Sequence, residues 1–209
     1  MTTTVRPYRG VSAQDRVAER RANLIEACLD LVGEHGPVPI TVEAICHRAG
    51  LTKRYFYESF RDRDAALFEI LDGLLQTIEH GVLTSVRDAA PLDRSRIMVE
   101  LIVSSLQEDP RKARLYAEAN AVEALRVHRE QAMERYVVLL REVVLPFADH
   151  SDQTRVARDV ISRVIVHGST ATIAGWLSGG FVAARADLVD GIIAGGMAAA
   201  GAVEAHPIS

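Results

Sequence analysis

Features that mark secreted, metal-binding or disulfide-linked proteins are scarce in this chain. Only two of its 209 residues are cysteine, too few for a disulfide framework, and neither Cys28 nor Cys46 lies in a pattern with zinc-ligand spacing. No secretory signal opens the sequence, because Arg6, Arg9 and Asp15 are followed by no apolar run. We therefore expect a cytoplasmic protein with buried structural thiols and with no metal or cofactor.

Motifs of catalysis are missing as well. The sequence contains no GxSxG, HExxH, phosphate-loop or GxGxxG motif. Its acidic residues also have no evident catalytic partners in the sequence. These absences argue against an enzyme. An enzyme with an unrecognised site and a helical protein-interaction module stay open as alternatives.

One apolar stretch has the length of a membrane span. Residues 164–184 contain no Asp, Glu, Lys or Arg over 21 positions. The stretch also holds four glycines, and Gly179–Gly180 should end a helix inside it. We therefore interpret it as a buried helix of a helical bundle and expect no membrane association.

The net charge of −4, with a pI near 6.0, taken alone argues against a protein that binds nucleic acid. The charge is unevenly distributed along the chain, however. Residues 1–63 contain ten Lys and Arg against eight Asp and Glu, a net +2, whereas residues 64–209 contain 14 against 20, a net −6. The sequence therefore predicts a mildly basic N-terminal part attached to an acidic body.

Hydrophobic periodicity predicts an all-α protein of about nine helices, since no β signal of four or more residues stands out. Apolar residues at positions 18, 22, 25, 29 and 32 mark one face of the first helix. Capping residues, glycines and prolines divide the rest of the chain. The helices are expected at about 17–32, 42–49, 53–58, 63–86, 94–107, 111–118, 121–148, 152–178 and 186–203.

Residues 41–71 have the outline of a helix-turn-helix, a motif whose second helix enters the major groove of DNA. Thr41 is a good N-cap for the first motif helix, Gly50 suits the turn, and Thr52 is an N-cap for the second. Phe56 and Phe60 are expected in the core of this small domain.

The second helix of the motif carries side chains suited to DNA. Free amides and the Thr52 hydroxyl can bind a phosphate, Lys53 supplies a point charge, and Arg54 can fork onto guanine. The tyrosines offer a ring to a thymine methyl or sugar. The DNA-contact candidates are Thr41, Thr52, Lys53, Arg54, Tyr55, Tyr57 and Arg63.

This stretch resembles the N-terminal domain of the TetR family of transcriptional regulators. The resemblance covers about 50 residues and is carried by Thr41, Ile45, Ala49-Gly50-Leu51-Thr52, Tyr57, Phe60, Asp62-Arg63-Asp64 and Leu67. Cys46 departs from the family's usual Ala, and Glu58-Ser59 depart from its usual aromatic pair. Farther along, Trp176-Leu177-Ser178-Gly179 looks like the family's Trp-Leu-x-Gly.

The resemblance implies a DNA-binding domain at 1–63 and a helical effector-binding and dimerisation domain at 64–209. It implies a homodimer formed through helices 152–178 and 186–203, acting on a near-palindromic operator, most often as a repressor that a small-molecule effector releases from DNA. The helix at 63–86, shared between the domains, is the expected lever. Candidates for the effector pocket, all of which can also be plain core or surface residues, are Tyr116, His128, Phe147, His167 and Trp176.

Overall fold

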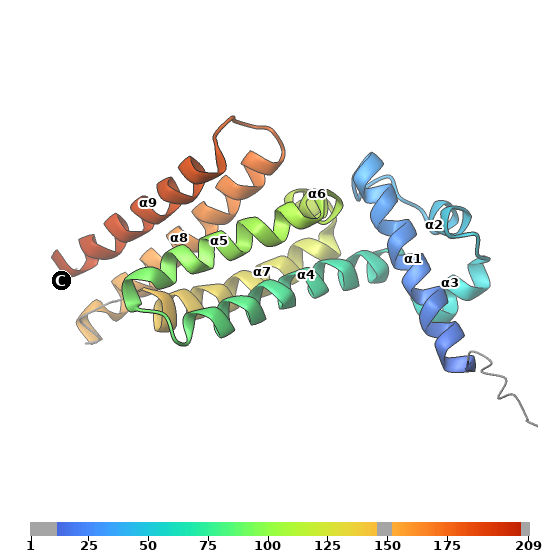
Figure 1. Ribbon diagram of the computed structural model, residues 1–209, viewed down its shortest axis with the longest axis horizontal. Coiled ribbons are helices and arrows are strands. Elements are labelled where there is room, and N and C mark those ends of the chain that lie inside the picture. The colour runs from blue at the N-terminus through green and yellow to red at the C-terminus, as the bar shows by residue number, and fades with distance from the viewer. Residues whose placement is uncertain (1–11, 146–151, 206–209) are drawn as a thin grey trace, which may run out of the picture.

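The computed structural model describes residues 12–145 and 152–205, and within these ranges every regular element is helical. Figure 1 shows a small unit of three helices at one end and a longer bundle at the other. Residues 1–11, which include Arg6 and Arg9, and the pocket candidate Phe147 lie outside the described residues. The helices are α1 (Ala13–His35), α2 (Val42–Ala49), α3 (Lys53–Ser59), α4 (Arg63–Val86), α5 (Pro91–Glu108), α6 (Pro110–Glu118), α7 (Glu123–Leu139), α8 (Asp152–Leu177) and α9 (Arg185–Ala205).

Side-chain caps begin the helices of the small unit where the sequence predicts them. The Thr41 hydroxyl accepts a hydrogen bond from the Ala44 amide at 3.1 Å, and an Asp62 carboxylate oxygen accepts one from the Ala65 amide at 2.8 Å. Each cap satisfies an amide that the helix itself leaves without a partner. The predicted starts of α2 and α4 are thereby confirmed. The helix α3 also begins where predicted, after Thr52, but the Thr52 side chain makes no capping hydrogen bond.

The expected apolar face of α1 is confirmed only in the C-terminal half of the helix. Leu29 and Val32 are buried as predicted, but Ala18 and Ala22 are exposed. Leu24 and Leu31, which lie off the predicted stripe, are buried as well. The reason is tertiary: α1 packs against α2 and also against α6 of the larger bundle, so its C-terminal half buries two faces rather than one stripe.

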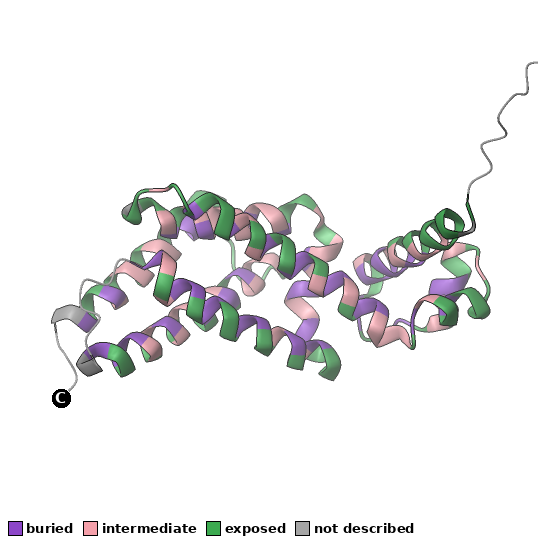
Figure 2. Cartoon of the chain, turned by 90° about the horizontal axis from the view of Figure 1, so that it is seen from below, coloured by how far each residue is buried: buried purple, intermediate pink, exposed green. Residues whose placement is uncertain are grey.

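The larger bundle consists of α4 to α9. The helix α4 packs against α1 and also against α5 and α7, and its buried residues run from Ala66 to Val86. Figure 2 shows buried residues in stripes along the sides of the helices that face one another. Arg63, where we placed the domain boundary, is the first residue of α4, so this helix belongs to both units.

One C-terminal helix ends differently from the sequence prediction. The helix expected at 121–148 ends as an α-helix at Leu139 and continues as a π-helical turn from Leu140 to Val144. The apolar stretch 164–184 is interrupted where the sequence predicts, because α8 ends at Leu177 and Gly179 adopts a positive φ of 72°. The helix α9 is long and apolar enough over Arg185–Val203 to cross a membrane, and 22% of that apolar window is buried.

Candidate DNA-binding surface and internal cavity

The turn between α2 and α3 presents one face of α3 to solvent. Gly50 adopts φ 65° with no side chain to obstruct it, and the Leu51 amide donates a 2.9 Å hydrogen bond to the Cys46 carbonyl. Phe56 and Ile45 are completely buried and fix α3 against α2. The opposite face of α3 therefore points away from the protein, as a recognition helix must.

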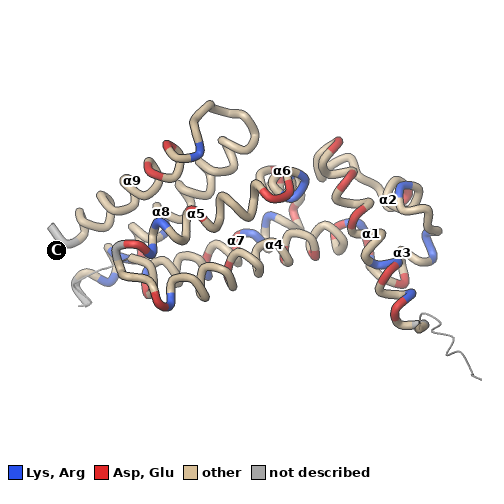
Figure 3. Tube along the Cα trace, viewed as in Figure 1, with Lys and Arg blue, Asp and Glu red and all other residues tan. Residues whose placement is uncertain are grey.

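Two cations lie at the start of this exposed face. The Lys53 side chain is 57% exposed and its Nζ lies 3.1 Å from Glu43 Oε2, and the Arg54 side chain is 85% exposed with its Nε 3.1 Å from Glu58 Oε1. The hydrogen bond that Lys53 Nζ donates to Glu43 raises the pKa of Lys53, so this side chain stays protonated. Because exposed ion pairs are weak in water, both cations can exchange their carboxylates for DNA. Figure 3 shows Lys and Arg along α2 and α3, at the end of the molecule away from α9.

Polar and aromatic groups surround these cations. Thr52 is exposed and its hydroxyl makes no capping hydrogen bond, which leaves it available to a phosphate oxygen. Tyr57 is 59% exposed, and Tyr55 is 37% exposed with the Arg20 guanidinium 4.5 Å from its ring centroid. In the sequence Arg20 is recognisable only as part of the basic charge of residues 1–63, since its approach to Tyr55 depends on how α1 crosses α3.

Arg63 has a structural role that was not expected. Its guanidinium donates hydrogen bonds to the carbonyls of Val38, at 2.8 Å, and Ile40, at 3.2 Å, and it binds the carboxylate of Asp64. Its side chain is only 28% exposed. The short loop between α1 and α2 leaves these carbonyls without helical partners, and Arg63 satisfies them. The phosphate contact expected of Arg63 stays a prediction beside this structural role.

Charged side chains also join α1 to α6. Arg111 Nη1 lies 2.6 Å from Asp30 and 3.1 Å from Glu26, both on α1, and its Nη2 lies 2.9 Å from Asp109. The Arg114 Nη1 donates a 3.0 Å hydrogen bond to the Gly33 carbonyl. The Arg111 guanidinium holds the pKa of Asp109 below its usual value. The helix α6 is thereby fastened to the small unit at several points.

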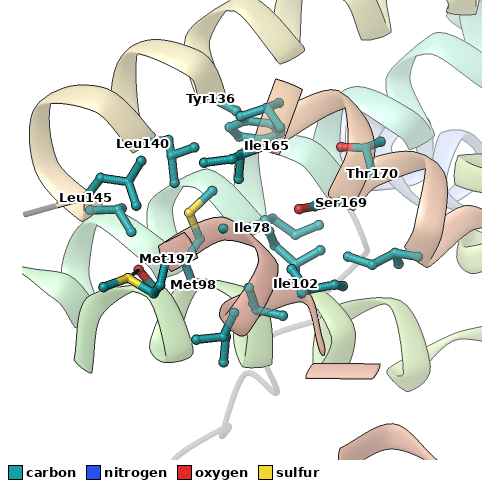
Figure 4. A pocket seen from close by; sticks show the side chains of 18 of the residues that line it. Ile78, Met98, Ile102, Tyr136, Leu140, Leu145, Ile165, Ser169, Thr170 and Met197 are labelled. Carbon is teal, nitrogen blue, oxygen red and sulfur yellow. Dashed lines mark hydrogen bonds between the residues drawn. The ribbon is translucent and has the colours of Figure 1, made fainter. Parts of the chain in front are cut away.

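A cavity of about 60 Å³ lies inside the larger bundle, between α4, α5, α7, α8 and α9. Tyr116 of α6 and Tyr136 of α7 form part of its wall, which is otherwise mainly aliphatic. Figure 4 shows Ser169 and Thr170 at one end of it and Met98, Met197 and Leu145 at the other.

Of the described candidates for an effector pocket, only Tyr116 lines this cavity. His128 instead lies against Phe68, with ring centroids 4.1 Å apart, and its Nε2 is 3.0 Å from Asp72 Oδ1. His167 is exposed, and Trp176 Nε1 donates a 3.0 Å hydrogen bond to the Ala183 carbonyl beyond the end of α8.

Other residues of the cavity wall were missed by the sequence analysis. One signal existed, because the wall residues of α8 follow helical i, i+3 and i+4 spacing. That spacing alone did not show which helices face them across the bundle. These α8 residues are Ile165, Val166, Ser169, Thr170 and Ile173.

Both cysteines are buried free thiols. Burial raises the pKa of Cys28 to about 12 and also raises that of Cys46. A thiol with a raised pKa is a poor nucleophile at neutral pH. Their environment agrees with the structural role expected from the sequence.

The described part of the chain is thus a helix-turn-helix unit joined to a helical bundle with an internal cavity. No family model and no curated protein sequence matches the chain. Solved structures match it along most of their length. A TetR-family transcriptional regulator from Syntrophomonas wolfei is 14% identical with a TM-score of 0.70, the alignment covering 88% of this chain and 96% of that one.

Two further structures are similar. The fatty acid degradation regulator FadR from Bacillus halodurans is 18% identical with a TM-score of 0.68, over 85% of this chain and 94% of that one. AibR, in complex with isovaleryl coenzyme A and operator DNA, is 19% identical with a TM-score of 0.61, over 83% and 96%. The chain therefore has the fold of the TetR-family transcriptional regulators, in agreement with the resemblance seen in its sequence.

Proposed function

We propose that this protein is a sequence-specific DNA-binding transcriptional regulator. The observation that carries the proposal is the exposed face of α3, where Lys53, Arg54 and Tyr57 point outward while Phe56 anchors the opposite face. Thr41 and Thr52, at the starts of the two motif helices, and Tyr55 would complete the contact with phosphates and sugars. The proposal includes no catalytic activity, metal or cofactor.

The protein is proposed to act as a homodimer. Val156, Val160 and Val164 recur every four residues on α8 with exposed fractions of 59%, 49% and 59%, and most of the apolar window of α9 is exposed. Contiguous apolar surface of this kind marks an interface. A second copy covering α8 and α9 buries it without a membrane, which agrees with a cytoplasmic location and places two recognition helices on a near-palindromic operator.

The internal cavity is proposed to bind a small-molecule effector that releases the protein from DNA, which makes it a repressor. The helix α6 connects the two sites, because Tyr116 lies in the cavity wall while Arg111 and Arg114 bind α1. An effector that moves Tyr116 therefore acts on the small unit through α6 as well as through α4. It shifts the population only insofar as it binds one conformation better than the other.

DNA binding is tested by selecting bound sequences from a random pool and measuring affinity for the selected operator by fluorescence anisotropy. The double variant Lys53→Ala/Arg54→Ala is expected to bind at least about 100-fold more weakly, because it loses a base contact and a phosphate contact. A matched control, Lys112→Ala/Arg126→Ala, removes the same charges from α6 and α7 and should bind normally. Unchanged affinity in the first variant, with the fold intact by circular dichroism, would contradict the proposal.

A further inference from the structure

Within residues 12–145 and 152–205, the wall of the internal cavity contains no charged group. None of the described residues that line it is Asp, Glu, Lys, Arg or His. An ionised ligand placed there would lose its hydration without gaining a counter-charge, which disfavours binding strongly. The ligand that fits this cavity is therefore uncharged where it lies inside the bundle.

Two hydroxyl groups of the wall donate their hydrogens to weak acceptors. Thr170 Oγ1 donates to Met133 Sδ at 3.4 Å, and Ser95 Oγ donates to Met197 Sδ at 3.9 Å. Ser95 and Thr170 are both buried. A thioether sulfur is a weak acceptor compared with oxygen, so a ligand oxygen would be a better partner for either hydroxyl.

The Thr170 hydroxyl offers a hydrogen-bond donor at its end of the cavity. Burial raises the pKa of Tyr116, which keeps its phenol protonated, while hydrogen bonding to Thr170 and Arg129 acts on that pKa in the opposite direction. The Thr170 hydroxyl donates to Met133 Sδ in this structure, and a ligand oxygen would be a stronger acceptor in its place.

The opposite end of the cavity can adapt its shape. Met98 and Met197 line it there (Figure 4), and unbranched thioether side chains change conformation at small cost. The present volume of about 60 Å³ is small for an organic ligand. An aliphatic chain is therefore expected to enter by displacing the two methionines.

We propose that the cavity binds an uncharged, largely aliphatic molecule with an oxygen acceptor, such as an ester or alcohol, whose oxygen accepts a hydrogen bond from Thr170. The inference rests on the proposed effector function, since it names the chemical class of the effector. It places the aliphatic part among the isoleucines of α4, α5 and α8 and at Met98 and Met197.

The charge requirement is tested with two isomeric probes, methyl heptanoate and octanoate, which have the same number of carbon and oxygen atoms but differ in charge at neutral pH. Isothermal titration calorimetry of the full chain without DNA is expected to give at least about tenfold tighter binding for the ester. Octanoyl coenzyme A tests whether an anionic carrier outside the cavity helps. Tighter binding of octanoate or of octanoyl coenzyme A than of the ester would overturn the inference.

The role of Thr170 is tested by Thr170→Val, which removes the hydroxyl with little change of shape. The preference for methyl heptanoate over nonane should fall by about three- to tenfold, the effect of one hydrogen bond. Thr170→Ser should retain the preference, and Thr84→Val, an exposed threonine on α4, should leave it unchanged. A preference retained in a folded Thr170→Val would refute the assignment of the donor.

Operator binding is measured separately, which distinguishes the two proposals. A protein that binds its operator but prefers octanoate refutes the ligand class and leaves DNA binding standing. A protein that binds methyl heptanoate but no DNA supports the ligand class and contradicts the proposed regulator.

Discussion

Replacing Arg63 by alanine should lower stability rather than act directly on DNA. In the wild type this guanidinium satisfies the carbonyls of Val38 and Ile40 and binds Asp64. The variant leaves both loop carbonyls without this partner, and it removes the link between the start of α4 and the loop that leads into α2. The small unit should unfold more easily as a result.

The expected loss of stability follows from the hydrogen bonds that Arg63 makes and from the exposure of its side chain to water. A hydrogen bond involving a charged group contributes about 1.5–3 kcal/mol, and partial exposure to water reduces this, so the loss is expected to be about 1–3 kcal/mol in total. Because 1 kcal/mol shifts Tm by about 2–4 °C in a protein of this size, the decrease should be about 2–12 °C. The expected loss is kept to the lower part of this energy range because 28% of the Arg63 side chain is exposed to water.

The assay is thermal unfolding by circular dichroism, together with the salt dependence of operator binding. Arg61→Ala is the matched control, because Arg61 lies two residues earlier, is 87% exposed and is paired with Asp62; its Tm should change by less than about 1 °C. A direct phosphate contact by Arg63 predicts the reverse pattern, with an unchanged Tm and a salt slope reduced by about 1. That outcome would refute the structural role argued here.

Three further predictions concern the turn, the dimer and a buried thiol. Gly50→Ala should destabilise the protein by about 1–2 kcal/mol, because the φ of Gly50 is positive. Gly73→Ala in the middle of α4, where an added Cβ meets nothing within 4 Å, should instead stabilise the protein. Equal effects of the two variants on the free energy of unfolding in chemical denaturation would contradict this argument from backbone conformation. Val164→Asp should convert dimers to monomers in sedimentation velocity, while Val127→Asp on α7 should not; an intact dimer in the first variant would place the interface elsewhere. The raised pKa of Cys28 makes unfolding easier as pH rises from about 9 toward about 12, since the unfolded thiol ionises first; Cys28→Ala should weaken that pH dependence, and an unchanged dependence would show that other groups cause it.

Local signals predicted the small unit well. Thr41, Gly50 and Asp62 act on amides and dihedral angles within four residues of themselves, so the sequence contains all that is needed to place the ends of α2, α3 and α4. The opposed faces of α3 also follow from helical periodicity. The DNA-contact assignments for Lys53 and Arg54 remain predictions for the binding assay.

Contacts between distant segments were not predictable in the same way. The structural role of Arg63 was not predicted, because its partners, the backbone carbonyls of Val38 and Ile40, carry no sequence signature. His128 looked like a ligand contact, yet it packs against Phe68 of α4. Which polar side chain faces a cavity depends on the rotation and crossing of helices, and these are fixed by packing over the whole bundle.

The sequence by itself determined an all-α chain, the position of its helix-turn-helix and the uneven charge that a net value of −4 conceals. These properties depend on periodicity, caps and composition, which are local. Only the tertiary structure decided which hydroxyls enter an uncharged cavity, and that α6 connects this cavity to α1. Those properties arise where helices distant in sequence meet, and there the packing of the bundle as a whole selects the contacts.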